Sequence, residues 1–526
     1  MKLKLAPLPL LALAVAEPTW AQRPESPRDY VGPNVRPNPR APRLDEDRNR
    51  QERDRPDGTE ESDFGSSPSI REWNTIAVDA SGLDHTPVND GEDRVYGEQL
   101  GPCRASRAMA IVHIAMFEAH NSAVGQPYLS YLQLAPAEGE VSADAAIAQA
   151  AHDTLASLFP SQASAFGESL TATLDGIPDG LAEDNGIALG RAAAQAVLTV
   201  RADDHSDHEE PIIGIDYFTS NEPGRWRQAP ISEGPIALGA LWSTVTPFTL
   251  KSAEQFRSPA PPELDSLSHT LAYVEAKRLG GDGVVTPTER TEEEEFIGVY
   301  WAYDGTPSLC APPRLYNQLI LTVAEEMGTE GLALSRLLAL ANVAMADTAI
   351  ATWDSKYYHD RGRPITLIRE AGTGIYDDGN PDTVQDVSWT PLGAPASNLL
   401  GPNFTPPFPS YPSGHAAFGG AVFETLRNYY GRDDIAFTFV SDEYNGVTLD
   451  NTGEVRELKP RSFDSLSQAE IENGDSRIYL GIHWSYDSYE GIELGRNVAN
   501  HVFTTAYQPA SDEEGDENID GDRRRR

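Results

Sequence analysis

The chain is poor in cysteine and in basic residues, and it lacks long apolar runs beyond its first residues. Only two cysteines, Cys103 and Cys310, occur among 526 residues, and neither lies in a Cys-x-x-Cys motif, so zinc and iron–sulfur sites have no support. The sequence leaves open whether the two cysteines form a disulfide. The 81 acidic against 41 basic residues give a net charge of −40, which argues against a nucleic-acid partner. An anion site in this chain must therefore be built locally, against the overall field.

The two ends of the chain differ in composition from its middle. Residues 1–21 combine two lysines, an apolar run and small residues, which predicts a signal peptide and a secreted or periplasmic protein. No later stretch reaches the roughly 20 apolar residues of a membrane-spanning helix. Residues 22–70 are rich in Pro, Arg and Asp, and residues 508–526 form an acidic block that ends in four arginines, so we expect both segments to be disordered.

Between these ends the dominant pattern is helical. Apolar residues recur at three- and four-residue spacing, with alanine between them, in the segments 143–159, 184–202, 311–327, 335–358 and 416–430. Strand-like alternation is rare, and no repeat of fixed length is present. We therefore predict an all-α fold of two stacked helical bundles of the four-helix type with long loops, one bundle over residues 71–265 and one over residues 266–507.

Three separated segments of the second bundle concentrate polar side chains. The first, WDSKYYHDRGRP, places Lys356 and Arg363 at the predicted end of a helix, where each alone is more often a solvated helix end. The second, PSYPSGHAAF, places Ser413, Gly414 and His415 at a predicted helix start, where a serine is by default an N-cap. Because helix starts also bind oxyanions, this stretch is suited to hold an anion beside a proton-transfer group.

The third segment, SRIYLGIHWSYD, contains Arg477, His483 and Asp487. His483 and Asp487 are four residues apart, so on a helix the carboxylate accepts a proton from one imidazole nitrogen and leaves the other as a nucleophile or ligand. Arg477 and His483 converge only if the backbone breaks near Gly481. A lone histidine beside Trp484 is most often a packing residue. Together, however, the three segments supply cations, a hydroxyl, a backbone amide and two histidines, which predicts a cage for a tetrahedral or trigonal-bipyramidal oxyanion.

In order along the chain, these residues read Lys-x6-Arg-Pro, Pro-Ser-Gly-His and Ser-Arg-x5-His-x3-Asp. This pattern resembles the signature shared by the vanadium-dependent haloperoxidases and the type 2 phosphatidic acid phosphatase superfamily. The resemblance implies a vanadate (vanadium V) cofactor whose metal is bound by His483. It implies that His415 is the acid–base group and that Lys356 also acts in catalysis, by polarising the peroxide. The residues that it assigns to the vanadate oxygens are Lys356, Arg363, Ser413, Gly414 and Arg477.

Sequence outside the signature resembles the fungal-type vanadium chloroperoxidases, as in YWAYDG, PPRLYNQ and PPFPSYPSGHAAFGGAVF, and the likeness extends with gaps over residues 101–506. It implies a chloride and bromide peroxidase that uses hydrogen peroxide to form hypohalous acid, which halogenates small organic substrates. It places Phe408 and Trp353 in the halide pocket and pairs Asp304, otherwise a turn residue, with Arg477. The alternative is an acid phosphatase of the same superfamily with a phosphohistidine intermediate. The sequence is compatible with either a monomer or a homo-oligomer.

A second polar cluster, RADDHSDHEEP at residues 201–211, crowds carboxylates and histidines into a predicted loop. Its composition is that of a metal site, but metal ligands must converge in space. A solvated loop after a helix is therefore the preferred interpretation.

Overall fold

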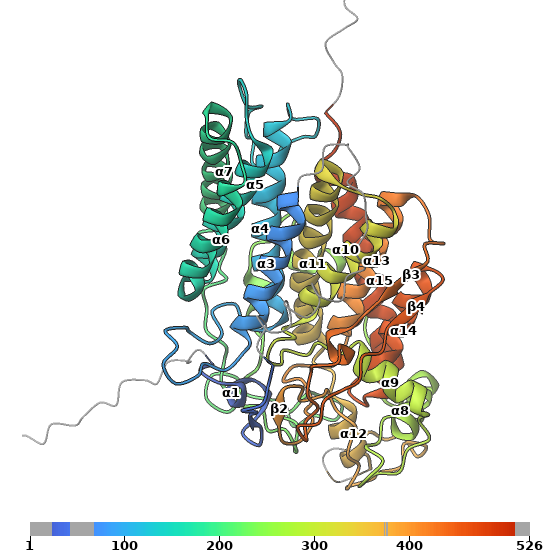
Figure 1. Ribbon diagram of the computed structural model, residues 1–526. Helices are drawn as coiled ribbons and strands as arrows, with labels where there is room; N and C mark the ends of the chain where they lie inside the picture. Colours follow the sequence, from blue (N-terminus) through green and yellow to red (C-terminus); the bar gives the residue numbers. More distant parts are fainter. Residues whose placement is uncertain (1–23, 43–67, 373, 375–376, 511–526) are drawn as a thin grey trace, which may run out of the picture.

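The computed structural model describes residues 24–42, 68–372, 374 and 377–510. Within them the chain is mostly helical, as the periodicity predicts (Figure 1). The first group of helices comprises α3 (Pro68–Asp84), α4 (Gly101–Ala123), α5 (Ala143–Leu158), α6 (Ala163–Asp175) and α7 (Leu181–Val200). The second comprises α8 (Leu267–Leu279), α9 (Glu292–Tyr300), α10 (Pro312–Glu326), α11 (Gly331–His359), α12 (Pro364–Glu370), α13 (Gly414–Tyr430), α14 (Leu466–Tyr479) and α15 (Ser485–Thr505). Short 3-10 turns are η1 (Pro160–Gln162), η2 (Trp242–Thr244), η3 (Ala253–Phe256) and η5 (Asp442–Tyr444).

The five segments with helical periodicity are the helices α5, α7, α10, α11 and α13. Their ends carry ordinary sequence signals. The Ser142 hydroxyl accepts a hydrogen bond from the Ala145 amide at 3.2 Å and so caps α5, and Pro312 is the first residue of α10. Helix α13 ends at Gly431, which adopts φ +68°, a conformation that glycine tolerates best. These helices could be predicted because their signals are local.

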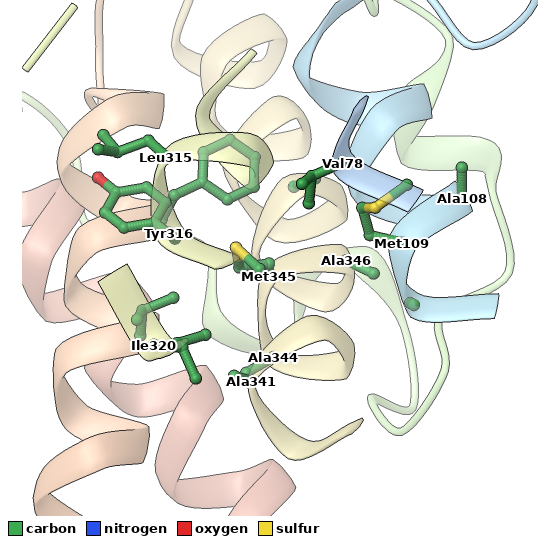
Figure 2. Packing of buried hydrophobic residues seen from close by; sticks show 14 of the residues in the cluster. Val78, Ala108, Met109, Leu315, Tyr316, Ile320, Ala341, Ala344, Met345 and Ala346 are labelled. Carbon is green, nitrogen blue, oxygen red and sulfur yellow. The ribbon is translucent and has the colours of Figure 1, made fainter. Parts of the chain in front are cut away.

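Helix α11 lies at the centre of the molecule (Figure 1) and contacts α4 of the first group as well as α13 and α15 of the second. Figure 2 shows part of this packing, in which side chains of α11 meet those of α10 and α4, among them Met345, Ile320 and Met109. By length and composition α11 is the one helix in the described residues that could cross a bilayer, but 89% of its most apolar stretch is buried inside the protein. It is therefore the core helix around which both groups assemble. The division into two bundles at residue 265 stays a prediction.

The expectation of disorder for residues 22–70 is wrong for residues 24–42 and for residues 68–70, which begin α3. The first of these segments forms α1 (Pro27–Val31) and β1 (Arg36–Pro37), and β1 pairs antiparallel with β2 (Leu399–Leu400). Its few large apolar side chains, those of Tyr30, Val31 and Val35, are buried in the main core. Composition predicted disorder because the segment cannot bury these side chains by itself, whereas the folded remainder of the chain buries them for it.

The predicted signal peptide and most of the predicted C-terminal tail lie outside the described residues. The expectation of disorder is wrong for residues 508–510, the first of the tail. The Leu129 amide donates to the Gln508 carbonyl at 2.8 Å, and the Ala510 amide donates to the Pro127 carbonyl at 2.9 Å. A second two-stranded ribbon, β3 (Phe437–Phe439) with β4 (Arg461–Phe463), is antiparallel and lies in the second half of the chain.

Helices α13 and α15 lie close together because glycines face the partner backbone. A Cβ atom on Gly495 would lie 2.0 Å from the Ala417 carbonyl oxygen, and one on Gly491 would lie 2.5 Å from the Ser413 carbonyl oxygen. Real Cβ atoms do not approach backbone atoms so closely, so only glycine allows this spacing. Since α13 begins at the Pro-Ser-Gly-His motif, its close packing on α15 also sets where that motif lies.

Replacing Gly495 with alanine is expected to lower the free energy of unfolding by about 1–3 kcal/mol, because the added methyl group must push α13 and α15 apart. Chemical denaturation followed by circular dichroism measures this change. The matched control is Gly167→Ala in α6, where an added Cβ meets nothing within 4 Å. That change should be neutral or stabilise by about 0.5–1 kcal/mol, because alanine favours helix more than glycine does. Similar losses in both variants would contradict the packing argument.

Candidate active site

The structure brings the three polar segments together at the ends of four helices. Lys356 lies in the last turn of α11, and Arg363 directly precedes α12. Ser413 is the N-cap of α13, and Arg477 lies in the last turn of α14. His483 lies in the link between α14 and α15. All five side chains are buried, so their charged and polar atoms depend on hydrogen bonds within the protein.

The backbone break expected near Gly481 is present. Helix α14 ends at Tyr479, Gly481 adopts φ +69°, and α15 begins at Ser485. A Cβ atom on Gly481 would lie 2.4 Å from the Gly280 carbonyl oxygen, so the turn requires glycine. His483 therefore lies outside a helix, and the expectation that it shares a helical face with Asp487 is wrong, although the two side chains still meet.

The two hydrogen bonds of the His483 ring determine which of its nitrogens carries the proton and which can act as a metal ligand. Nε2 lies 2.9 Å from Nη1 of Arg363, which can only donate, so Nε2 presents its lone pair. Nδ1 therefore carries the proton and donates a hydrogen bond to Oδ2 of Asp487 at 2.8 Å. Burial, followed by the charges of Arg363 and Lys356, lowers the pKa of His483 well below its ordinary value, so the ring is neutral. Burial raises the pKa of Asp487 to about 7.

Two buried guanidinium groups present donors that nothing else in the described structure satisfies. Arg363 donates from Nε to the Phe408 carbonyl and from Nη1 to the Ile482 carbonyl, both at 2.9 Å, but Nη2 has no partner. Arg477 donates from Nη2 to Oδ1 of Asp304 at 2.6 Å, the pairing that the resemblance implies, while Nε and Nη1 have no partner. Burial lowers the pKa of Arg363 to about 9. Buried unpaired donors are costly, so this arrangement favours a bound anion.

Lys356 is placed differently from what an oxyanion ligand requires. Its Nζ atom donates to the carbonyls of Pro409 and Ser410 at 2.9 Å and to that of Pro412 at 2.5 Å. Burial, followed by the charge of Arg363, lowers the pKa of Lys356 well below its ordinary value. In this arrangement Lys356 orders the loop before α13 through three hydrogen bonds. To contact an anion, its ammonium group would have to exchange one of these hydrogen bonds for a bond to the anion.

Ser413 caps α13, as the simplest interpretation of its position predicts. Its hydroxyl oxygen accepts from the Ala416 amide at 3.3 Å, which leaves the hydroxyl proton free to donate. Gly414 is the first residue of the helix, so its amide is among those that have no partner within the helix. A Cβ atom there would lie 3.1 Å from the Trp353 ring, so the absent side chain keeps this amide accessible.

His415 is suited to move a proton. It is 6% exposed, and neither of its ring nitrogens has a hydrogen-bond partner among the described residues. Burial, followed by the charge of Arg477, lowers the pKa of His415 well below its ordinary value. The ring is therefore neutral and able to accept a proton from a group that enters beside it. The Tyr316 hydroxyl holds the backbone here by donating to the His415 carbonyl at 3.0 Å.

A small cavity joins these groups to aromatic side chains. Phe408 and Trp353 form one wall, with ring centroids 5.1 Å apart, and the Phe408 centroid lies 5.1 Å from Nζ of Lys356. The cavity is lined by Tyr30, Pro102, Asp304, Ala311, Pro312, Trp353, Pro406, Phe408, Gly414, His415, Phe418, Arg477 and His483. The lining residues that sequence reasoning missed are Tyr30, Pro102, Ala311, Pro312, Pro406 and Phe418. No local sequence signal could have placed Tyr30 in the cavity wall, since its segment has the composition of a disordered chain.

The alternative metal site at residues 201–211 does not form. No group of three or more metal-ligating side chains converges anywhere in the part of the chain that the structure describes. The expectation of a solvated loop is also wrong for Asp204, which is buried and accepts from Nε of Arg107 at 2.7 Å and Nε of Arg201 at 2.8 Å. Cys103 and Cys310 are both buried and free, so the possible disulfide is not present.

The arrangement fits vanadate. A neutral imidazole whose Nε2 is a hydrogen-bond acceptor is a suitable metal ligand once Arg363 gives up its bond to that nitrogen, and the unpartnered N–H groups of Arg363 and Arg477 suit the oxygens of a tetrahedral anion. Three buried basic side chains, those of Lys356, Arg363 and Arg477, lie with the two carboxylates of Asp304 and Asp487, so basic groups outnumber acidic ones here although the whole chain carries −40. The anion site is thus built against the overall field.

Comparison with known proteins gives consistent similarities. The family model of the "VCPO second helical-bundle domain" matches residues 336–512. Vanadium chloroperoxidase of Curvularia inaequalis is 29% identical in an alignment 497 residues long. The alignment covers 79% of this chain and 78% of that protein. Among solved structures, the first bacterial vanadium-dependent iodoperoxidase matches with a TM-score of 0.66 and 21% identity, over 86% of this chain and 100% of that one. A bacterial vanadium-dependent chloroperoxidase in its holo form matches with a TM-score of 0.56 and 17% identity, over 80% of this chain and 95% of that one.

Proposed function

This chain belongs to the vanadium-dependent haloperoxidases, with vanadate as its cofactor, and from this premise we propose that it oxidises chloride and bromide with hydrogen peroxide. The overall reaction is X⁻ + H₂O₂ + H⁺ → HOX + H₂O, where X is the halogen. The hypohalous acid then halogenates small organic molecules. We also propose that the protein is exported, on the composition of residues 1–21.

The observation that supports this proposal most strongly is the coincidence of two features beside one cavity, which His483 and Arg477 line. One is a neutral His483 whose Nδ1 proton is held by Asp487, so that Nε2 is the acceptor nitrogen, here bonded to Arg363, that a metal would take. The other is the set of unpartnered guanidinium N–H groups on Arg363 and Arg477. Bound vanadate supplies a Lewis-acid centre that makes peroxide electrophilic toward halide.

The residues of this chain have separate roles in the proposal. His483 would bind vanadium through Nε2, and Asp487 would keep that nitrogen unprotonated. The vanadate oxygens would be held by Arg363, Arg477, the Ser413 hydroxyl and the Gly414 amide, and Lys356 would contribute charge to the same region. Asp304 would fix the plane of the Arg477 guanidinium, because a carboxylate at 2.6 Å restrains its rotation.

His415 would accept a proton from hydrogen peroxide as the peroxide enters the cavity, and would return that proton when hypohalous acid leaves. Its free ring nitrogens and lowered pKa suit both transfers, since the base must be neutral before the first one. The aromatic wall of Phe408 and Trp353 would exclude water from the halide, which makes the halide a better nucleophile.

A direct assay tests the proposed function. Purified protein is incubated with vanadate, hydrogen peroxide and chloride, bromide or iodide in separate reactions, and halogenation of a dye is followed by absorbance. Vanadate-dependent dye halogenation with chloride and with bromide is the expected result. Oxidation of iodide alone would contradict the proposed halide range. Hydrolysis of a phosphomonoester without vanadate, together with no oxidation of any halide, would instead favour the phosphatase alternative.

Phe408 is proposed to favour chloride oxidation. It lines the cavity with its ring centroid 4.9 Å from Cζ of Arg363, and the ring brings no hydrogen-bonding or titrating group there. Phe408→His should therefore lower the ratio of chloride to bromide oxidation by roughly ten-fold, because chloride is the harder halide to oxidise and to strip of water. Steady-state kinetics with each halide measures the ratio. Phe408→Leu is the apolar control and should keep the ratio. Equal loss with both halides in Phe408→His would remove Phe408 from this role.

A further inference from the structure

Tyr30 lines the catalytic cavity although it comes from the far N-terminal segment of the chain. It lies in α1, is 3% exposed, and shares the cavity with His415, Arg477 and His483. It lies more than 300 residues before the stretch that the family model matches, residues 336–512. The wall that Tyr30 forms is therefore contributed by a part of the chain outside the helical bundle that carries the anion-binding residues.

The ring of Tyr30 is held firmly against two glycines. A Cβ atom on Gly305 would lie 2.6 Å from Cε1 and from the hydroxyl oxygen of Tyr30, and one on Gly101 would lie 3.7 Å from Cε2. Gly305 also adopts φ +86°, so both the close contact with Tyr30 and the backbone conformation favour glycine at this position. The Tyr30 hydroxyl also donates to the Asp304 carbonyl at 3.4 Å, beside the residue that pairs with Arg477.

The backbone that carries Tyr30 is anchored on both sides of the ring. Val31 and Val35 are buried, and β1 pairs with β2 so that Arg36 lies opposite Leu400. A side chain anchored in this way cannot move aside without breaking these contacts. The cavity that it helps to enclose has a volume of about 30 Å³, on a scale where one water takes roughly 10–15 Å³. There is room for small groups but not for a branched alkyl group.

We propose that Tyr30 is a specificity-determining residue that restricts the peroxide substrate to hydrogen peroxide. Its ring fills the space that the alkyl group of an organic hydroperoxide needs in order to bring its O–O bond to the site. The inference rests on the proposed haloperoxidase function. The reaction that Tyr30 suppresses is X⁻ + ROOH + H⁺ → ROH + HOX, in which the halide is oxidised, the O–O bond breaks and the alkyl oxygen takes up the proton.

The test compares hydrogen peroxide with tert-butyl hydroperoxide as the oxidant of bromide, in the full-length protein loaded with vanadate. Tyr30→Ala is expected to raise kcat/KM for tert-butyl hydroperoxide relative to hydrogen peroxide by about ten-fold or more, mainly through KM. Tyr30→Phe keeps the ring and should stay within about two-fold of the wild type. Tyr30→Leu retains an apolar anchor if the alanine variant folds poorly, and it should show a smaller increase in the same direction.

A matched control and a binding measurement separate this role from general damage. Tyr96 is buried near Tyr30 but does not line the cavity, so Tyr96→Ala should leave the ratio of the two oxidants unchanged. Calorimetric titration of the cofactor-free protein with vanadate should give affinities for wild type and Tyr30→Ala within about three-fold of each other, because Tyr30 supplies none of the anion donors.

The outcomes distinguish this inference from the function on which it rests. Wild-type protein that oxidises bromide with hydrogen peroxide, but an unchanged oxidant ratio in both Tyr30→Ala and Tyr30→Leu, would overturn the role of Tyr30 and leave the function intact. An equal rise in Tyr30→Phe would also overturn it, since the hydroxyl and not the ring would then be responsible. Absence of halide oxidation in the wild type with hydrogen peroxide would remove the proposed function and this inference with it.

Discussion

Replacing His483 with alanine is expected to abolish stable vanadate binding, with a loss of affinity of more than about 100-fold. Removing a group that merely orients a metal ligand already costs about 10–100-fold, and His483 is proposed as the ligand itself. The structure supports this position because His483 lines the cavity, Nδ1 is held by Asp487 at 2.8 Å, and Nε2 is the acceptor nitrogen, which Arg363 now contacts at 2.9 Å. Halide oxidation should fall to background in the same variant. Calorimetric titration of vanadate and the dye-halogenation assay measure the two effects.

The control for this variant is His359→Ala. His359 lies between Lys356 and Arg363 in the sequence, but its Nε2 bonds to the Ser258 carbonyl at 2.8 Å, and it does not line the cavity. That variant should bind vanadate as the wild type does. Unchanged affinity in His483→Ala, or an equal loss in His359→Ala, would exclude His483 as the metal ligand.

Replacing His415 with alanine is expected to separate binding from catalysis. Vanadate affinity should change little, because the groups proposed to hold the vanadate oxygens do not include the His415 side chain. The kcat for halide oxidation should fall by about 10²–10⁴-fold, the usual contribution of a general acid–base group. Both ring nitrogens lack a hydrogen-bond partner among the described residues, and His415 lines the cavity, which makes it the best-placed proton carrier there.

The pH profile gives a readout that a purely structural role of His415 would not produce. Burial and Arg477 lower the pKa of His415 below its ordinary value, so the ring is neutral at neutral pH and becomes protonated only as the pH falls through that lowered pKa. Wild-type kcat/KM for hydrogen peroxide should therefore decline on the acidic side, and this limb should be absent from the residual activity of His415→Ala. The same acidic limb in the variant, or loss of vanadate binding equal to that of His483→Ala, would contradict the assignment.

Much of the fold could be predicted because the signals are local. The spacing of apolar residues within α11 or α13 depends only on the geometry of one helix, and caps such as Ser142 and Ser413 act within a single turn. The residues of the anion site could be identified for a related reason. A cage of cations, a helix start and two histidines is chemically unusual, and its three segments keep a recognisable spacing.

Local signals failed where a side chain is satisfied by a distant part of the chain. Lys356 could be read as an anion ligand, but the carbonyls of residues 409–412 receive its donors. Asp204 sits in a stretch with the composition of a solvated loop, but Arg107, on α4, pairs with it and helps to bury it. Both contacts were invisible to local signals for one reason, since burial and pairing depend on neighbours that lie about 50 to 100 residues away.

By itself, then, the sequence determined an all-helical chain and the set of residues from Lys356 to Asp487 that suits an oxyanion. Only the tertiary structure decided how these residues serve the site. It placed His483 in a turn at Gly481 and brought Tyr30 from the N-terminal segment to the cavity wall. The physical reason is that periodicity and capping are properties of one segment, whereas the shape of a cavity is a property of the segments that enclose it.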